Sequence, residues 1–133
     1  MLLDKNSVTA NKAVKFAHEN VNGKGNTVKK LHIAISTDKI TETVSDYSQR
    51  LNAEPSLVVP GEYALWRTAT LNLSVRQDAK VDPGSLRHLG WEDPSAEEFT
   101  QDVDVNGIVW EQFNADLQAE EINELWPDAD YQP

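Results

Sequence analysis

The chain has 133 residues, a length that fits one domain with a sizeable core but not two. Its 39% hydrophobic content and four tryptophans exclude a disordered chain, and the absence of cysteine excludes disulfides, thiolate metal sites and a cysteine nucleophile. The net charge of −10 divides into +3 over residues 1–80 and −13 over residues 81–133, so we expect neither nucleic acid nor an anionic membrane as a partner.

The first predicted element is a short amphipathic helix over residues 9–21. Its small apolar side chains recur at helical spacing along one stripe, at Ala10, Ala13, Val14, Ala17 and Val21. The glycines of residues 22–26 predict its end. No stretch reaches the length of a membrane span, and no basic region followed by an apolar run opens the chain. We therefore expect a soluble, cytoplasmic protein.

A β-α-β-β-β unit is predicted over residues 30–77. It begins with a strand over residues 31–36, in which alternation places His32 and Ser36 opposite an apolar face. A helix follows whose apolar side is Ile40, Val44, Tyr47 and Leu51. Three short strands come next, at residues 56–59, 63–67 and 71–76.

A second unit begins with a predicted strand over residues 86–92 and ends with another over residues 108–113. Only fifteen residues separate these strands, too few for a helix and two more strands. We expect one helical turn at residues 94–99 and little else. A C-terminal helix is predicted over residues 114–126.

The sequence thus predicts an α+β protein with a curved mixed sheet and with helices at both ends. It forms a single domain, residues 1–133, with an N-terminal helical extension (1–29), a first module (30–77), an abridged second module (85–113) and a C-terminal helix with an acidic tail (114–133).

Three strands each carry one residue that could bind a metal: His32, His88 and Glu111. Two imidazoles and one carboxylate on the concave side of a sheet would form the facial triad of non-haem Fe(II) or Mn(II) enzymes. By the same alternation, Ser36, Asn72, Ser74 and Arg76 are predicted to line the cleft and to orient an anionic substrate.

The succession of LHIAIS, ALWR, LNLSVR, LRHLGWE and VNGIVWEQF resembles the glyoxalase/bleomycin-resistance/extradiol-dioxygenase superfamily, also called vicinal oxygen chelate proteins. The resemblance covers residues 30–113. It implies paired β-α-β-β-β modules around a divalent metal that is chelated by adjacent oxygens of the substrate. Carried over, it gives His32, His88 and Glu111 as metal ligands, with Fe, Mn or Zn as the metal and no organic cofactor.

This chain departs from the pattern of that superfamily at two places. Asn72 stands where the four-ligand glyoxalases carry another ligand, which favours a three-ligand, dioxygenase-like site. The shortened second module removes part of the cleft wall and leaves a strand edge unpaired. A homodimer in which the partner completes the wall is predicted; the flanking helices are the alternative.

A rival metal signal overlaps the last strand. Residues 102–107 copy the first six positions of a calcium-binding loop, but the twelfth position, which should be glutamate, is Phe113. An ordinary Asn-Gly turn into a strand is the alternative.

Two functions therefore remain open. One is a metal enzyme that acts on a small oxygen-chelating metabolite. The other is a non-catalytic small-molecule-binding or assembly module that keeps the fold without the metal.

Overall fold

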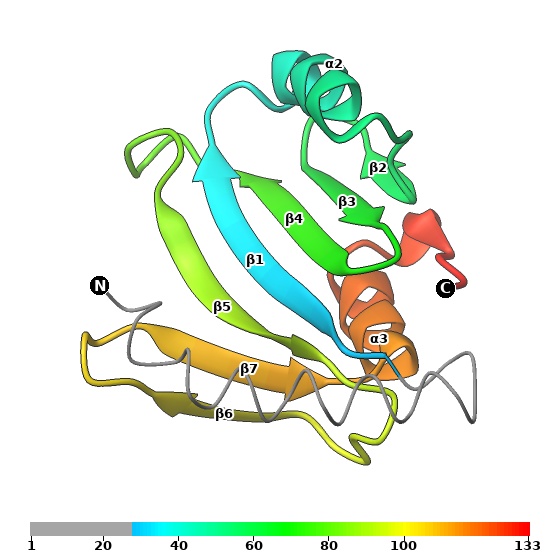
Figure 1. Ribbon diagram of the computed structural model, residues 1–133. Helices are drawn as coiled ribbons and strands as arrows, with labels where there is room; N and C mark the ends of the chain where they lie inside the picture. The colour runs from blue at the N-terminus through cyan, green and yellow to red at the C-terminus, as the bar shows by residue number, and fades with distance from the viewer. Residues whose placement is uncertain (1–27) are drawn as a thin grey trace.

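The central feature of the protein is a seven-stranded mixed sheet that does not close (Figure 1). The structure is a computed structural model that describes residues 28–133. The helix predicted over residues 9–21 and the residues before 28 therefore lie outside the described residues. Within them the protein is α+β with a curved sheet and flanking helices, which confirms the predicted fold class.

The first module has the predicted β-α-β-β-β order. It comprises β1 (Lys30–Thr37), α2 (Ile40–Leu51), β2 (Leu57–Val59), β3 (Tyr63–Arg67) and β4 (Leu71–Gln77). Strand β4 returns parallel to β1, whereas β3 runs antiparallel to both β2 and β4. Parallel strands such as β1 and β4 need a long connection, and α2 forms part of it.

Helix α2 covers the convex face of the first module. Its predicted apolar side packs on a core from β3 and β4 in which Trp66 is fully buried. The helix ends at Asn52, which adopts the left-handed conformation (φ 50°) and whose N–H caps the last turn. Trp91 and Trp110 do not belong to this core, because both lie in strands of the other module.

The second module contains β5 (Leu86–Glu92), β6 (Thr100–Val103) and β7 (Val109–Phe113), with no helix in this stretch of the described chain. Strand β5 is parallel to β7, and β6 pairs antiparallel with β7. The module is abridged as predicted, but β6 was not foreseen. The helical turn expected at residues 94–99 is also wrong, because Asp93 closes a β-turn instead: its carbonyl accepts from the N–H of Ala96 at 3.0 Å.

The two modules join through their first strands. The sheet order is β2-β3-β4-β1-β5-β7-β6, and β1 pairs antiparallel with β5 at the centre. Each module contributes a first strand that is parallel to its own last strand. The centre of the sheet is therefore the place where residues from both modules come side by side.

Helix α3 (Ala115–Leu125) lies across the concave face, behind the sheet in Figure 1. The side chain of Asn114 caps its first turn by accepting from the N–H of Leu117 at 2.7 Å. Ala119 and Ile122 pack against β3 in a second core. A 3-10 turn, η1 (Pro127–Ala129), follows. Neither α2 nor α3 is long and apolar enough to cross a membrane.

Gly90 occupies the middle of β5, where a side chain would push neighbouring backbone apart. A Cβ atom at this position would lie much too close to the carbonyl of Glu111 on β7. We expect Gly90→Ala to lower the free energy of unfolding by roughly 1–3 kcal/mol, because β7 must move to make room. Urea unfolding checks this. Thr100→Ala, at an exposed strand position, is the control and should stay within about 0.5 kcal/mol of the unaltered protein. Equal stability of the two variants would contradict the close approach.

Candidate metal centre

Strand pairing brings His32, His88 and Glu111 to one place on the concave face. His32 on β1 lies opposite Gly90, and Gly90 lies opposite Glu111 on β7, so the two ligand candidates flank a residue without a side chain. His88 stands two positions before Gly90 on the same strand and therefore points to the same face. The three residues form a triangle over the three central strands.

The side chains converge closely. The Nε2 atoms of His32 and His88 are 3.0 Å apart, and Nε2 of His88 is 3.0 Å from Oε1 of Glu111. One ligand atom from each of the three residues lies within 4.8 Å of the others. Among the described residues no other group of this kind occurs. This His-His-Glu group could hold a metal ion.

The spacing suits a divalent transition metal. Nitrogen and oxygen ligands bind such ions at about 2.0–2.2 Å, so adjacent octahedral ligands are about 3.0 Å apart. Two edges of the triangle have this length, His32–His88 and His88–Glu111. Three protein ligands on one face of an octahedron would leave the opposite face to water or substrate.

Asn72 determines which nitrogen of His32 is free to bind a metal. Nδ1 of His32 lies 2.9 Å from Oδ1 of Asn72 and 3.1 Å from the Asn72 backbone carbonyl. Both atoms are acceptors, so Nδ1 carries the proton and donates. The lone pair is then on Nε2, the atom that faces His88. Metal-binding histidines are oriented in this way by a partner on the other ring nitrogen.

The orientation of Asn72 is itself fixed by a buried network. Its Nδ2 donates to Oε1 of Glu92 and to Oε1 of Gln118, both at 2.8 Å, while Gln118 donates back to Oδ1 of Asn72 at 3.1 Å. Glu92 in turn accepts two hydrogen bonds from Arg67, both at 2.8 Å. Flipping the amide would place its NH₂ against the Nδ1–H of His32, so the network permits one arrangement only.

Burial and hydrogen bonds shift the pKa values of two of these groups. Desolvation lowers the pKa of His32, which favours the neutral imidazole that binds metals. Burial by itself would raise the pKa of Glu92, but hydrogen bonds from Arg67 and Asn72 outweigh it and lower that pKa below its ordinary value. Glu92 is therefore a buried anion with a dedicated cation.

A small cavity of about 40 Å³ opens beside the triad. It has room for roughly two or three water molecules. All three ligand candidates line it, and α3 supplies one wall through side chains that include Leu117, Glu121 and Leu125. The flanking-helix alternative for completing the cleft thus corresponds to α3 in the structure.

The predicted substrate-binding residues divide into two pairs. Ser74 and Arg76 line the cavity. Ser36 and Asn72 are buried and do not line it, and Asn72 instead holds His32.

Arg87 also lines the cavity, although strict alternation along the strand would turn it away from the face of its neighbour His88. A β-bulge explains this. The β1–β5 register shifts between Ala34 and Ile35, so Arg87 is the extra residue and turns to the same side as its neighbour His88. Strand alternation could have found Glu92, which shares a face with His88, but it could not have found the bulge.

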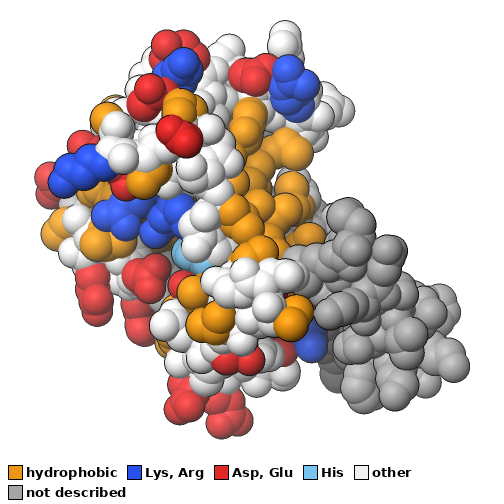
Figure 2. Space-filling model, turned by 90° about the vertical axis from the view of Figure 1, so that its left-hand side faces the viewer, with side chains coloured by type: hydrophobic (Ala, Val, Ile, Leu, Met, Phe, Trp, Pro, Cys, Tyr) orange, Lys and Arg blue, Asp and Glu red, His pale blue; other side chains and the backbone are white. Residues whose placement is uncertain are grey.

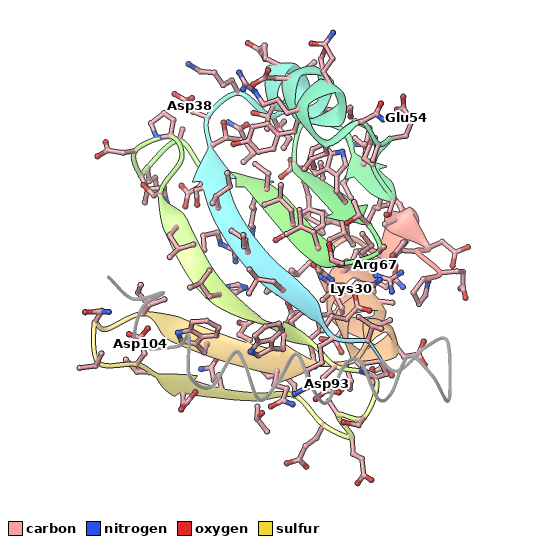
Figure 3. All side chains as sticks on the ribbon, in the orientation of Figure 1. Lys30, Asp38, Glu54, Arg67, Asp93 and Asp104 are labelled. Atoms are coloured by element: carbon pink, nitrogen blue, oxygen red, sulfur yellow. The ribbon has the colours of Figure 1, made fainter. Side chains whose placement is uncertain are left out.

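The calcium-like sequence at residues 102–107 forms the β6–β7 hairpin. Asp104 lies at this turn (Figure 3), and its carboxylate closes the turn by accepting from the N–H groups of Asn106 and Ile108 and from the indole of Trp110, at 2.8–2.9 Å. Hydrogen bonding from Trp110 lowers the pKa of Asp104 most. Both carboxylate oxygens are used within the hairpin, as in the ordinary-turn alternative.

Comparisons with known proteins leave the family open. No family model matches the sequence, and no curated protein matches it. Among solved structures, a hypothetical protein from Staphylococcus aureus is similar with a TM-score of 0.48 and 8% identity, over 65% of this chain and 33% of that chain. The chain spans about a third of the length of that protein.

The contribution of the hydrogen-bond network beneath the site can be tested at the Arg67–Glu92 ion pair. Glu92→Gln keeps the shape but leaves the Arg67 guanidinium, whose side chain is 20% exposed, without its anion. We expect a loss of about 2–3 kcal/mol in the free energy of unfolding at pH 7, because removal of one partner leaves the other charge uncompensated. Because the pKa of Glu92 is lowered in the folded state, its contribution is present above the ordinary value of 4.5 and is lost as the pH falls further. The difference between the two proteins should therefore narrow below that pH. Glu54→Gln, at an exposed carboxylate (Figure 3), is the control and should show neither effect.

Proposed function

We propose that the protein is a divalent-metal-dependent, glyoxalase/dioxygenase-like enzyme that acts on a small metabolite with adjacent oxygen donors. The observation that carries the proposal is the convergence of the ligand atoms of His32, His88 and Glu111 from three strands. Convergence alone is also found in structural ion networks, but here the free nitrogen of His32 is directed into the triad by a buried partner.

His32, His88 and Glu111 would hold the metal, with Fe, Mn or Zn as candidates. When bound, such an ion supplies Lewis-acid polarisation of a substrate oxygen. The chain's own residues do the rest. Phe113 packs edge-on against His32 at 4.9 Å between ring centroids and keeps water from that side of the ring. Burial, followed by the charge of Glu111, raises the pKa of Glu121, so this carboxyl at the cavity wall could hold or accept a proton.

A second candidate is a non-catalytic binding or assembly module. It is favoured by one observation: the two imidazoles and the carboxylate are also at hydrogen-bonding distance from each other, so they can satisfy one another without any ion. The cytoplasmic location and the homodimer remain predictions in either case.

Metal content separates the two functions. Protein purified without added metal should contain Fe, Mn or Zn at one equivalent, and His88→Ala should bind that metal at least 100-fold more weakly, since even loss of a residue that supports a ligand typically costs 10- to 100-fold. Elemental analysis and calorimetry measure this. His18→Ala, which removes the third histidine of the chain, is the matched control and should bind normally. If His88→Ala does not fold, Glu111→Gln serves in its place. Metal-free protein that takes up no added ion would favour the module.

Thermal stability provides an independent measurement. Saturation with Mn²⁺ at 100 times the dissociation constant should stabilise the folded state by about 2.7 kcal/mol and raise the melting temperature, because the unfolded chain lacks the site. A chelator should reverse the effect. Glu111→Gln should show neither response, whereas Asp102→Asn, in the calcium-like segment, should respond like the unaltered protein. A response that disappears in Asp102→Asn instead would assign the ion to the hairpin.

A further inference from the structure

Two arginines border the cavity beside the triad. Arg76 comes from β4 of the first module, and Arg87 comes from the bulge of β5 in the second. In Figure 2 a histidine appears in a hollow with Lys and Arg side chains on one side of it. The cavity therefore combines a candidate metal centre with positive charge from both halves of the sheet.

Arg87 is unusual in its surroundings. It is the only Lys or Arg in residues 81–133, a stretch that carries fourteen Asp or Glu. Its side chain borders the cavity, and the residue is exposed, so an anion from solution can reach its guanidinium group.

Neither guanidinium is neutralised within the described part of the chain. Over residues 28–133, Arg76 and Arg87 make no salt bridge within 4.0 Å and donate no side-chain hydrogen bond. Each has five N–H donors, and within the described residues most of this hydrogen-bonding capacity is unused. Arg76 is nevertheless held in place, because its guanidinium lies 5.4 Å from the centroid of the Trp126 ring.

The charged side chains that line the cavity indicate which kind of ligand it would bind. Two carboxylates, Glu111 and Glu121, also line the cavity. A divalent ion at the triad would leave an excess of at least about two positive charges, because the ion and the two arginines are opposed by two carboxylates at most. Guanidinium groups bind carboxylate and phosphoryl oxygens through paired N–H donors, and a dianion would restore neutrality.

We propose that the ligand of this cavity is a small acid, a dianionic carboxylate or phosphoryl compound, whose charged oxygens are bound by Arg76 and Arg87. This inference rests on the proposed function and specifies its substrate class. The volume of about 40 Å³ limits the enclosed part of the ligand to a few non-hydrogen atoms. A neutral dicarbonyl compound would leave both guanidinium groups without an anion.

The test is calorimetric titration of the full-length protein, metal-free and Mn²⁺-loaded, at low ionic strength. The probes are oxalate, inorganic phosphate and oxamide, the uncharged counterpart of oxalate. We expect oxalate or phosphate to bind and oxamide to bind at least 10-fold more weakly. The comparison of oxalate with phosphate distinguishes a carboxylate from a phosphoryl ligand. Arg76→Gln and Arg87→Gln should each weaken binding of the anion at least 10-fold, and Arg50→Gln, at an exposed arginine of α2 paired with Asp46, should not.

The outcomes separate this inference from the proposed function. Anion binding that depends on both arginines in a protein that takes up no metal would support the anion site and contradict the metal enzyme. Oxalate binding that requires Mn²⁺ but is unchanged in both arginine variants would overturn the anion site and leave the metal enzyme standing. Equal binding of oxalate and oxamide, or no anion binding in either form, would also overturn it. Mn²⁺ affinity should be preserved in both variants, and melting curves identify any variant that fails to fold.

Discussion

The buried amide of Asn72 is the interaction on which the candidate site depends. It joins His32 on β1, Glu92 on β5 and Gln118 on α3, so one side chain links the two first strands to the helix that covers the concave face. Each buried polar group in this network has a partner, which matters because an unpaired one costs roughly 1–3 kcal/mol. The Arg67–Glu92 pair at its base gives Asn72 a fixed acceptor. The same hydrogen bonds therefore stabilise the fold and position His32.

Convergence of the three ligand candidates follows from topology. A residue at a central position of a strand has neighbours on the two adjacent strands, and β5 lies between β1 and β7. His32 and Glu111 therefore flank Gly90, where the absence of a side chain leaves the space between them open. Because β1 and β5 are the first strands of their modules, the site can exist only where both modules meet.

Much of this arrangement could be predicted from the sequence, because strands and helices with one buried face carry a clear periodicity. Alternation placed His32, His88 and Glu111 on the face where the structure brings them together. Alternation failed where local geometry departs from it. Arg87 reaches the cavity through a bulge, and β6 arises from an exposed segment without an apolar pattern. The partnership of Asn72 with His32 depends on strand register, which no single segment encodes.

Helix α3 supplies part of the cleft wall that the shortened second module lacks. The prediction of a homodimer assumed that a second chain must complete the cleft wall, but α3 supplies a wall from within the chain. It is anchored on the first module through Ile122 and Tyr63, so the helix spans from the apolar core to the triad. Among the described residues, the edge strand at the end of the second module is β6, which has four residues. A short edge strand that carries a charge, here Asp102, is a common protection against pairing with other chains. The wall from α3 corresponds to the flanking-helix alternative, and the homodimer stays a prediction.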